Sequence, residues 1–325
     1  MSKNFGERTT ALEVVEGHDL TEKEVIVTGA NSGIGVETAR ALAKAGARVV
    51  IAARDLKKAN EVKDDIIKTT GNNNVEVEEL ELGSLKSVDK FVERYLATKK
   101  PLHILINNAG IMNTPQGVTE DGFELQFGVN HVGHFALTVG LLPALKAAKN
   151  SRVVMVSSLA HIWGDIDFDD IHFKIRPYHG FASYGQSKTA NALMAVELTR
   201  RFKADGIYSN ALMPGAIATG LQRHMLKEEL ENLGWVESNP KFKTIEQGAS
   251  TTVWAAVAPE LERKGGLYLE HCQIAPIIPD EEVKIAKETN FQNGFPFGYL
   301  AYAVDPENAK KLWTVTEEMI ENARK

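Results

Sequence analysis

Three glycines separate an apolar run from an amphipathic one near the start of this 325-residue chain. They are Gly29, Gly33 and Gly35. The run before them, 24–28, is short, apolar and bounded by polar residues, which is typical of a buried strand. Residues 36–45 have helical spacing and stop at Gly46, and 49–53 is the next apolar run. This order predicts a strand–turn–helix–strand unit with a right-handed crossover.

The glycine turn has the setting that a dinucleotide-binding turn requires. Glycine is needed where the backbone takes a positive φ or approaches a ligand closely. The unpaired N–H groups and the dipole of the following helix attract a pyrophosphate. The spacing is G-x-x-x-G-x-G, not the commoner G-x-G-x-x-G, and a glycine-rich turn without a ligand is the alternative. The expected cofactor contacts here are Gly29, Asn31, Ser32, Gly33, Ile34 and Gly35.

The end of the second predicted strand bears on which dinucleotide is bound. NAD sites usually place an acidic residue there, which binds the ribose 2′-hydroxyl. Here the small Ala52 and Ala53 precede Arg54, whose guanidinium could pair with a 2′-phosphate. The neighbouring Asp55 argues the other way, and a solvated loop arginine is the plain alternative. The sequence therefore favours NADP(H) and leaves NAD(H) open.

A phenol and an ammonium stand four positions apart at Tyr184 and Lys188, in a segment with helical apolar spacing. Tyrosine is a poor base at neutral pH because its pKa is about 10. A nearby cation favours the phenolate, so Lys188 and a positive nicotinamide ring would let Tyr184 act as general acid or base. An isolated Y-x-x-x-K arises by chance in many helices. Ser158 adds support, because it ends the predicted strand 152–158 and ligands gather at such strand ends.

These motifs, in this order, resemble those of the short-chain dehydrogenase/reductase family over roughly residues 25–269. The chain is most similar to the branch of retinol dehydrogenases and WW-domain oxidoreductase-like proteins. N-H-V-G-H-F from Asn130, S-S-L-A-H around Ser158, and the long gap to Tyr184 carry this resemblance. It implies an α/β fold: a Rossmann-type doubly wound parallel sheet of about seven strands with helices on both faces. That branch often prefers NADP, in agreement with Arg54.

The resemblance also implies a role for each matching residue. Tyr184 would be the acid/base, and Lys188 would lower its pKa and hold the nicotinamide ribose. Ser158 would stabilise the carbonyl or alkoxide oxygen, and Asn130 would order a water that links Lys188 to solvent. Glu81 is longer than the family's usual aspartate at the adenine. Further cofactor contacts are implied at Glu81, Leu82, Asn108, Ala109, Gly110, Tyr184, Lys188, Pro214, Gly215, Ile217 and Thr219.

Composition bounds the class of protein and its partners. With 43% hydrophobic and 25% charged residues, the chain fits a globular protein. Its net charge of −6 argues against nucleic acid and anionic membrane surfaces as partners. Residues 1–24 are charged and lack an apolar core, so they predict neither a signal peptide nor an integral membrane anchor. The single cysteine, Cys272, is compatible with a reducing compartment, and we expect a cytoplasmic protein.

We expect one catalytic domain, 25–269, with an N-terminal arm, 1–24, and a C-terminal extension, 270–325. Prolines and glycines predict that the first half of the extension is irregular, and Asp305 is the expected cap of a terminal helix. Homodimers or homotetramers are usual in the family, although the extension could cover one such face.

The substrate pocket is the least readable part of the chain. Residues 161–164 and 173–181 lie between Ser158 and Tyr184, and 221–235 occupies the place of the family's mobile lid. Their apolar and aromatic content suggests a hydrophobic alcohol or carbonyl substrate, with core or dimer packing as the alternative. His131 and His134 lack a supporting metal motif, so packed helix histidines and no metal are expected.

Two functions of different classes compete. The set of Asn130, Ser158, Tyr184 and Lys188 favours an NADP-dependent alcohol dehydrogenase or carbonyl reductase. A non-catalytic NADP-binding scaffold or redox-sensing protein is the alternative, by analogy alone. A sugar epimerase or dehydratase shares Y-x-x-x-K, but the N-N-A-G segment at 107–110 and the glycine spacing argue against it.

Overall fold

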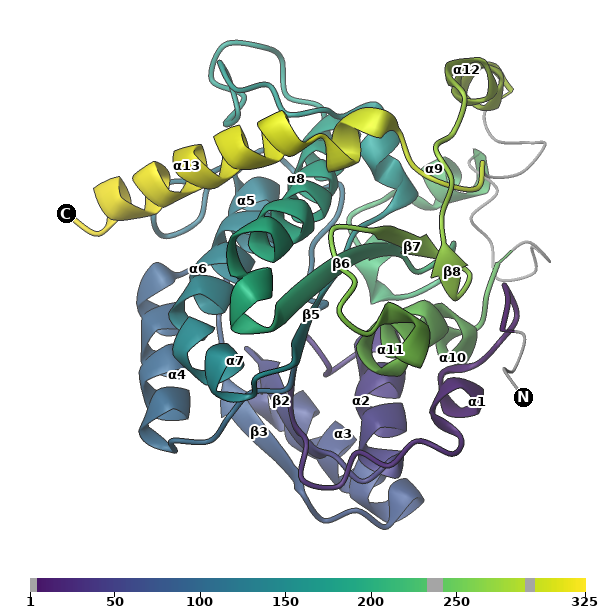
Figure 1. Ribbon diagram of the computed structural model, residues 1–325. Helices are drawn as coiled ribbons and strands as arrows, with labels where there is room; N and C mark the ends of the chain where they lie inside the picture. Colours follow the sequence, from purple (N-terminus) through teal and green to yellow (C-terminus); the bar gives the residue numbers. More distant parts are fainter. Residues whose placement is uncertain (1–4, 233–241, 290–295) are drawn as a thin grey trace.

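The computed structural model describes residues 5–232, 242–289 and 296–325 (Figure 1). Its centre is an eight-stranded sheet with the order β3-β2-β1-β4-β5-β6-β7-β8. Strands β1 to β7 are parallel, and β8 pairs antiparallel with β7. The strands are β1 Glu24–Thr28, β2 Arg48–Ala53, β3 Val75–Glu79, β4 Ile104–Asn107, β5 Ser151–Val156, β6 Ile207–Met213, β7 Tyr268–Glu270 and β8 Gln273–Ile274. The predicted doubly wound parallel sheet is confirmed, with one short antiparallel strand beyond the expected seven.

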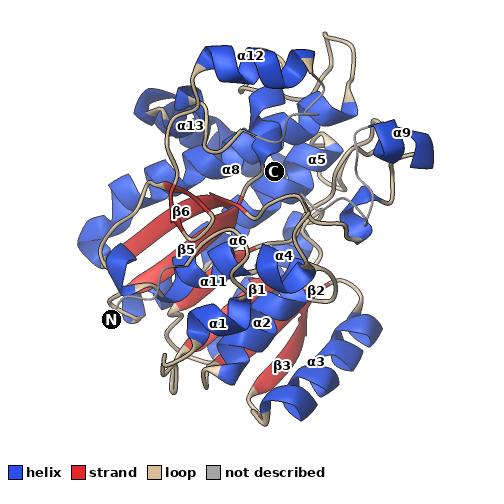
Figure 2. Cartoon of the chain, turned by 90° about the vertical axis from the view of Figure 1, so that its right-hand side faces the viewer, coloured by secondary structure: helices blue, strands red, loops and turns tan. Residues whose placement is uncertain are grey.

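Helices cover both faces of the sheet (Figure 2). On one face lie α1 (Ala11–Val15), α2 (Ile34–Lys44), α3 (Leu56–Thr70) and α11 (Ser250–Val257), which bury one apolar cluster. On the other lie α4 (Leu85–Ala97), α6 (Gly133–Gly140) and α8 (Gly180–Phe202), which bury a second. The remaining helices are α5 Leu125–Phe127, α7 Leu142–Ala147, α9 Lys227–Asn232, α10 Ile245–Gly248, α12 Asp280–Glu288 and α13 Pro306–Ala323.

The strand order reverses between β1 and β4, since the chain winds outward from β1 in one direction and from β4 in the other. In such sheets the carboxyl ends of the strands at the reversal leave a crevice between the loops. The glycine turn follows β1, and the loop after β4 carries residues 108–110. The topology therefore brings the predicted cofactor segments together at one edge of the sheet.

The C-terminal extension packs against the sheet domain. Helix α13 lies along α8 (Figure 1), and its Trp313 is buried with the ring centre 4.7 Å from that of Phe135. The first half of the extension is less irregular than predicted, because α12 forms a helix with acidic residues in its first turn and Val283 and Ala286 buried. Acidic side chains complement the dipole at a helix N-terminus. Residue 294, one of the glycines behind that expectation, lies outside the described residues.

The predicted terminal helix is confirmed, and the Asp305 carboxylate caps it by accepting the Asn308 N–H at 2.8 Å. Strand β8 lies inside the segment that we assigned to the extension. The division into 1–24, 25–269 and 270–325 stays a prediction. Within the part of the chain that the structure describes, no helix has the length and apolar character needed to cross a membrane.

Candidate active site

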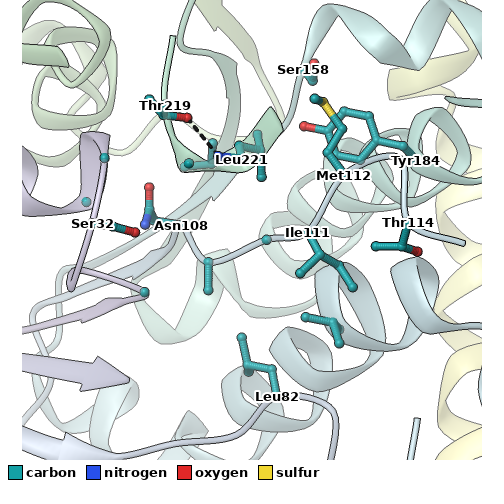
Figure 3. A pocket seen from close by; sticks show the side chains of 18 of the residues that line it. Ser32, Leu82, Asn108, Ile111, Met112, Thr114, Ser158, Tyr184, Thr219 and Leu221 are labelled. Atoms are coloured by element: carbon teal, nitrogen blue, oxygen red, sulfur yellow. Dashed lines mark hydrogen bonds between the residues drawn. The ribbon is translucent and has the colours of Figure 1, made fainter. Parts of the chain in front are cut away.

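A cavity of 1110 Å³ runs along the carboxyl edge of the sheet (Figure 3). Every predicted site residue lines it except Asn130, which lies behind the wall. Figure 3 shows Ser32, Asn108 and Thr219 toward one end and Ser158, Tyr184 and Met112 toward the other. The structure thus brings the predicted cofactor and catalytic residues into one continuous space.

Positive φ angles favour glycine at two positions of the turn, and close packing adds to this at Gly29. Gly29 has φ +67°, and a Cβ there would lie 2.8 Å from the Cβ of Ala109. Gly33, at φ +59°, is the N-cap of α2 and has no side-chain cap. Positive φ is strained for residues with a Cβ, and a bare helix N-terminus offers N–H groups to an anion. The turn therefore has the shape and the polarity of a phosphate site.

Thr28 joins the two cofactor segments. Its Oγ1 atom accepts the backbone N–H groups of Asn108 at 2.9 Å and Ala109 at 3.0 Å. In return, the Asn108 side-chain amide donates to the Thr28 carbonyl at 2.8 Å. The loop after β4 is fixed against the end of β1 by these three bonds.

Arg54 and Glu81 form an ion pair at the end of the cavity next to β2. The Arg54 Nη1 atom lies 3.0 Å from Glu81 Oε2, and the arginine side chain is 77% exposed. Glu81 Oε1 accepts the Gly83 N–H at 3.0 Å. Asp55, which had argued for NAD, caps α3 by accepting the Lys58 N–H at 3.0 Å. Its carboxylate therefore has a structural role, while Arg54 and Lys58 both line the cavity.

Asn130 sits in a π-helical stretch, Gly128–Val132, between α5 and α6. Its side chain makes two bonds of 2.9 Å with the backbone of Ile111, next to the loop after β4, and donates to Ser187 Oγ at 2.9 Å. The backbone carbonyl of Asn130 accepts from His134 Nδ1 at 2.9 Å. His134 Nε2 is therefore left to accept from the Thr28 hydroxyl at 2.9 Å. Single π-turns are frequent at functional sites.

Tyr184, Lys188 and Ser158 meet where α8 crosses the end of β5. Tyr184 and Lys188 are each 3% exposed, and the Lys188 ammonium lies 5.5 Å from the centre of the phenol ring. Burial raises the pKa of Tyr184, and a hydrogen bond with the Ser158 side chain opposes this shift. Burial lowers the pKa of Lys188 to about 8. The buried phenol thus stays protonated at neutral pH beside the lysine.

The far end of the cavity is apolar. Tyr184 packs with Met112, Ala160 and Met225 in one buried cluster. Partly buried side chains that pack against this cluster are Trp163, Phe181, Leu221 and Leu230. They come from the segments after Ser158 and after Thr219, as the sequence predicted. Residues 233–235 of the predicted lid lie outside the described residues.

Sequence reasoning missed Lys243, which supports the wall of the cavity from behind. Its Nζ atom donates to the Pro214 carbonyl at 3.3 Å, and its backbone N–H donates to Ala216 at 2.9 Å. Gly215, at φ +116°, leaves room for the lysine stem, since a Cβ there would lie 2.6 Å from Lys243 Cδ. No motif marks this lysine, because the contact joins segments that are far apart in the sequence.

The described residues contain no group of three or more His, Cys, Asp or Glu side chains that could hold a metal ion. His131 and His134 are both fully buried, as expected for packed helix residues. His131 bonds to Thr316 on α13 at 3.1 Å, while His134 faces Thr28 and Asn130. Their partners are side-chain hydroxyls and a backbone carbonyl.

The profile of the short chain dehydrogenase family matches residues 23–230, which is more than half of the chain. That span contains the glycine turn, Asn130, Ser158, Tyr184 and Lys188. The chain belongs to the short-chain dehydrogenase family.

Curated relatives place it further within the family. A probable oxidoreductase of Streptomyces lividans is 43% identical over 302 residues, covering 91% of this chain and 96% of that protein. Retinol dehydrogenase 12 of Mus musculus is 46% identical over 251 residues, covering 77% and 78%. This short-chain dehydrogenase is therefore an oxidoreductase in the retinol dehydrogenase-like branch, and the predicted resemblance is confirmed.

Solved structures agree with the fold. The 3-ketoacyl-(acyl-carrier-protein) reductase of Brucella melitensis, crystallised with NADH, is 25% identical and has a TM-score of 0.61. The match covers 78% of this short-chain dehydrogenase and 97% of that chain.

Proposed function

We propose that this short-chain dehydrogenase is an NADP-dependent oxidoreductase that interconverts a hydrophobic alcohol and its aldehyde or ketone. The observation that carries this proposal is the buried Tyr184 phenol beside Ser158 and Lys188, at the apolar end of a cavity that begins at the glycine turn. A binding protein without catalysis has no need for a buried phenol beside Ser158 and Lys188.

The residues present fit a dinucleotide. The bare N-terminus of α2 and the positive φ of Gly29 and Gly33 suit the pyrophosphate. Arg54 and Lys58 suit a 2′-phosphate, because both are cations beside the small Ala52 and Ala53. The loop after β4 and the segment 214–219 would hold the nicotinamide half, with Lys188 on the ribose. When bound, the nicotinamide ring supplies or accepts the hydride. The relative crystallised with NADH leaves NAD(H) as the second cofactor to test.

The chain's own residues would manage the proton. Tyr184 would give its hydroxyl proton to the carbonyl oxygen during reduction and take it back during oxidation. Ser158 would donate a hydrogen bond to the same oxygen, which is where negative charge develops. Lys188 and the positive ring would lower the phenol pKa in the oxidation direction. Asn130, which holds the loop wall through Ile111, would order the water that returns the proton to Lys188.

The substrate class follows from the side chains around Tyr184. Met112, Trp163, Phe181 and Leu221 line the cavity and carry no charge. Burial of apolar surface is worth roughly 25 cal/mol per Å², so a large apolar alcohol or carbonyl gains more here than a small one. We therefore expect retinoid, steroid and aryl carbonyls to bind more tightly than small aliphatic carbonyls and to give a higher kcat/KM.

The test follows the absorbance of NADPH and of NADH with a panel of retinal, steroid ketones, aryl aldehydes and small aliphatic carbonyls. Tyr184→Phe removes the acid and should abolish turnover while NADPH binding is retained. Ser158→Ala should lower turnover and keep binding as well. Activity retained in Tyr184→Phe would overturn the proposed role of this residue. Tight NADPH binding without turnover of any carbonyl would instead favour a cofactor-binding scaffold.

A further inference from the structure

His161 is a fully buried histidine that contacts both Ser158 and the C-terminal extension. We call residues 158–164 the serine loop. His161 lies in the 3₁₀ turn Leu159–Trp163, directly after Ser158. Its Nδ1 atom lies 2.7 Å from the backbone oxygen of Ser158. On the other side of the ring, the Leu300 N–H of the extension donates to Nε2 at 3.0 Å.

These contacts fix the state of the imidazole. A backbone N–H can only donate, so Nε2 carries no proton. The ring proton is then on Nδ1, where it is donated to the Ser158 carbonyl, which can only accept. Burial lowers the pKa of His161 to about 4, which agrees with a neutral ring at physiological pH.

Other hydrogen bonds also hold the Ser158 carbonyl and also join the serine loop to the extension. The Tyr268 hydroxyl donates to the Ser158 carbonyl at 3.2 Å, and Tyr268 and His161 have ring centres 5.3 Å apart. From the extension, the Tyr302 hydroxyl donates to the His161 carbonyl, and Lys287 Nζ donates to the Ile162 carbonyl at 2.8 Å. The extension is therefore bonded to two consecutive residues of the serine loop, His161 and Ile162.

The loop also lies backbone-to-backbone on the helix that carries Tyr184. A Cβ at Gly185 would lie 2.4 Å from the Ala160 carbonyl, and a Cβ at Gly164 would lie 2.6 Å from the Ala182 carbonyl. A shift of the loop would therefore move Ser158 relative to Tyr184. Misplacing a catalytic group by about 1 Å can cost about a hundredfold in rate.

We propose that His161 is a positioning residue through which the C-terminal extension sets the placement of Ser158 against Tyr184. The Leu300 N–H fixes the tautomer, and the Nδ1 proton then fixes the Ser158 carbonyl. The inference rests on the proposed function, because it takes Ser158 and Tyr184 as the groups that act on the substrate oxygen.

Two substitutions separate the two sides of the ring. His161→Asn keeps an amide donor near the Nδ1 position but is too short to reach Leu300. His161→Gln reaches the Leu300 N–H but offers no donor to the Ser158 carbonyl. We expect His161→Gln to lower kcat by about tenfold or more with the Kd for NADPH unchanged. His161→Asn should keep a kcat much closer to that of the wild type. Equal losses in the two variants, or a parallel rise in the Kd for NADPH, would overturn the proposal.

A second pair tests the contribution of the extension. Leu300 has φ −83°, which proline can adopt, so Leu300→Pro removes the N–H with little backbone change. Leu300→Ala loses the same side chain but keeps the N–H, and is the matched control. We expect a lower kcat in Leu300→Pro than in Leu300→Ala, and equal values would contradict the coupling.

A spectroscopic measurement keeps this inference separate from the proposed function. The ring nitrogen chemical shifts of His161 should show a protonated Nδ1 and a bare Nε2 in the wild type, and a change in Leu300→Pro. The opposite tautomer would overturn the inference even in an active enzyme. A wild type without turnover, in contrast, would overturn the proposed function and leave the tautomer to be measured on its own.

Discussion

The ammonium of Lys188 donates to the backbone oxygen of Val156 at 3.0 Å, while the Ser158 side chain lowers the pKa of the Tyr184 phenol against the effect of burial. The two groups are neighbours on α8 but have different partners. Burial raises the pKa of Tyr184 and lowers the pKa of Lys188 to about 8. In the cofactor-free protein, Lys188 is thus the first of the two to lose its proton as the pH rises.

This order predicts the alkaline limb of the pH profile for carbonyl reduction. The value of kcat/KM for NADPH, measured at saturating carbonyl, reports groups of the cofactor-free enzyme. We expect it to fall as the pH rises through about 8, because the ammonium is lost. In Lys188→Arg the guanidinium stays charged, so the fall should move to higher pH. The same profile in both enzymes would assign the limb to another group.

The ion pair of Arg54 and Glu81 predicts a specific effect on cofactor choice. The Glu81 carboxylate pairs with the Arg54 guanidinium and would compete there with a 2′-phosphate. Glu81→Gln keeps the acceptor for the Gly83 N–H but removes the competing charge. Because an exposed ion pair is worth about 0–1 kcal/mol, we expect the Kd for NADPH to fall by up to about fivefold and the Kd for NADH to stay the same.

Fluorescence titration with each reduced cofactor checks this prediction. Arg54→Ala is the companion variant and should weaken NADPH binding more than NADH binding. An equal change for both cofactors in Glu81→Gln would place Glu81 at the adenine and not at the 2′-phosphate.

Local chemistry made part of this site predictable from the sequence. The turn after β1 and the strand β5 are marked by glycines and apolar runs, which depend on neighbours in the chain, although β5 ends at Val156 and not at the predicted Ser158. The topology then follows, because alternating strands and helices allow few arrangements. The family resemblance supplied the expected role of Asn130, which no spacing shows.

Contacts between distant segments were not predictable. Lys243 meets Pro214, and Leu300 meets His161, through packing that leaves no periodic pattern. Helix α12 was missed because Pro276 and Pro279 both precede it, although proline is compatible with a helix start and Pro279 is the N-cap. The role of Asp55 as a helix cap was also hidden, since an acid after a strand has two readings.

Gly29 provides a test of close packing at the cofactor turn. In Gly29→Ala the new Cβ would combine a positive φ with contacts of 2.8 and 2.9 Å to Ala109. Gly71→Ala, at φ +76° with nothing within 4 Å, carries the backbone strain alone. We expect Gly71→Ala to lower the free energy of unfolding by about 1 kcal/mol with normal NADPH binding. Gly29→Ala should lose more stability and bind NADPH weakly, as measured by urea unfolding and titration.

The buried histidines predict loss of stability in acid. Burial lowers the pKa of His131 to about 3 and the pKa values of His134 and His161 to about 4, below the usual 6.5. Below about pH 6.5 the unfolded chain therefore binds more protons than the folded protein does. The free energy of unfolding consequently falls as the pH falls from about 7 to about 5. Each histidine contributes roughly 2 kcal/mol to this loss.

Glu270 acts in the opposite sense and supplies the control. Burial raises the pKa of its carboxyl to about 7, so its contribution to stability decreases as the pH rises from about 4.5 to about 7. Removing it in Glu270→Gln should make the acid loss steeper between pH 7 and pH 5. Urea unfolding of both proteins at the two pH values measures the difference, and a shallower loss in Glu270→Gln would refute the assignment.

Trp313 tests whether the C-terminal helix belongs to the cooperative core. It is 2% exposed, meets Phe135 edge-to-face, and has its ring centre 4.8 Å from the Arg201 guanidinium of α8. Because Trp313→Ala removes a large buried side chain, we expect it to cost about 3–5 kcal/mol, in one unfolding transition. Glu318→Ala, on the exposed side of the same helix, should change stability by less than about 0.5 kcal/mol. Since Trp313 does not line the cavity, the folded variant should bind NADPH normally. An early separate transition in Trp313→Ala would show that α13 unfolds on its own, and the extension would then be a separate unit.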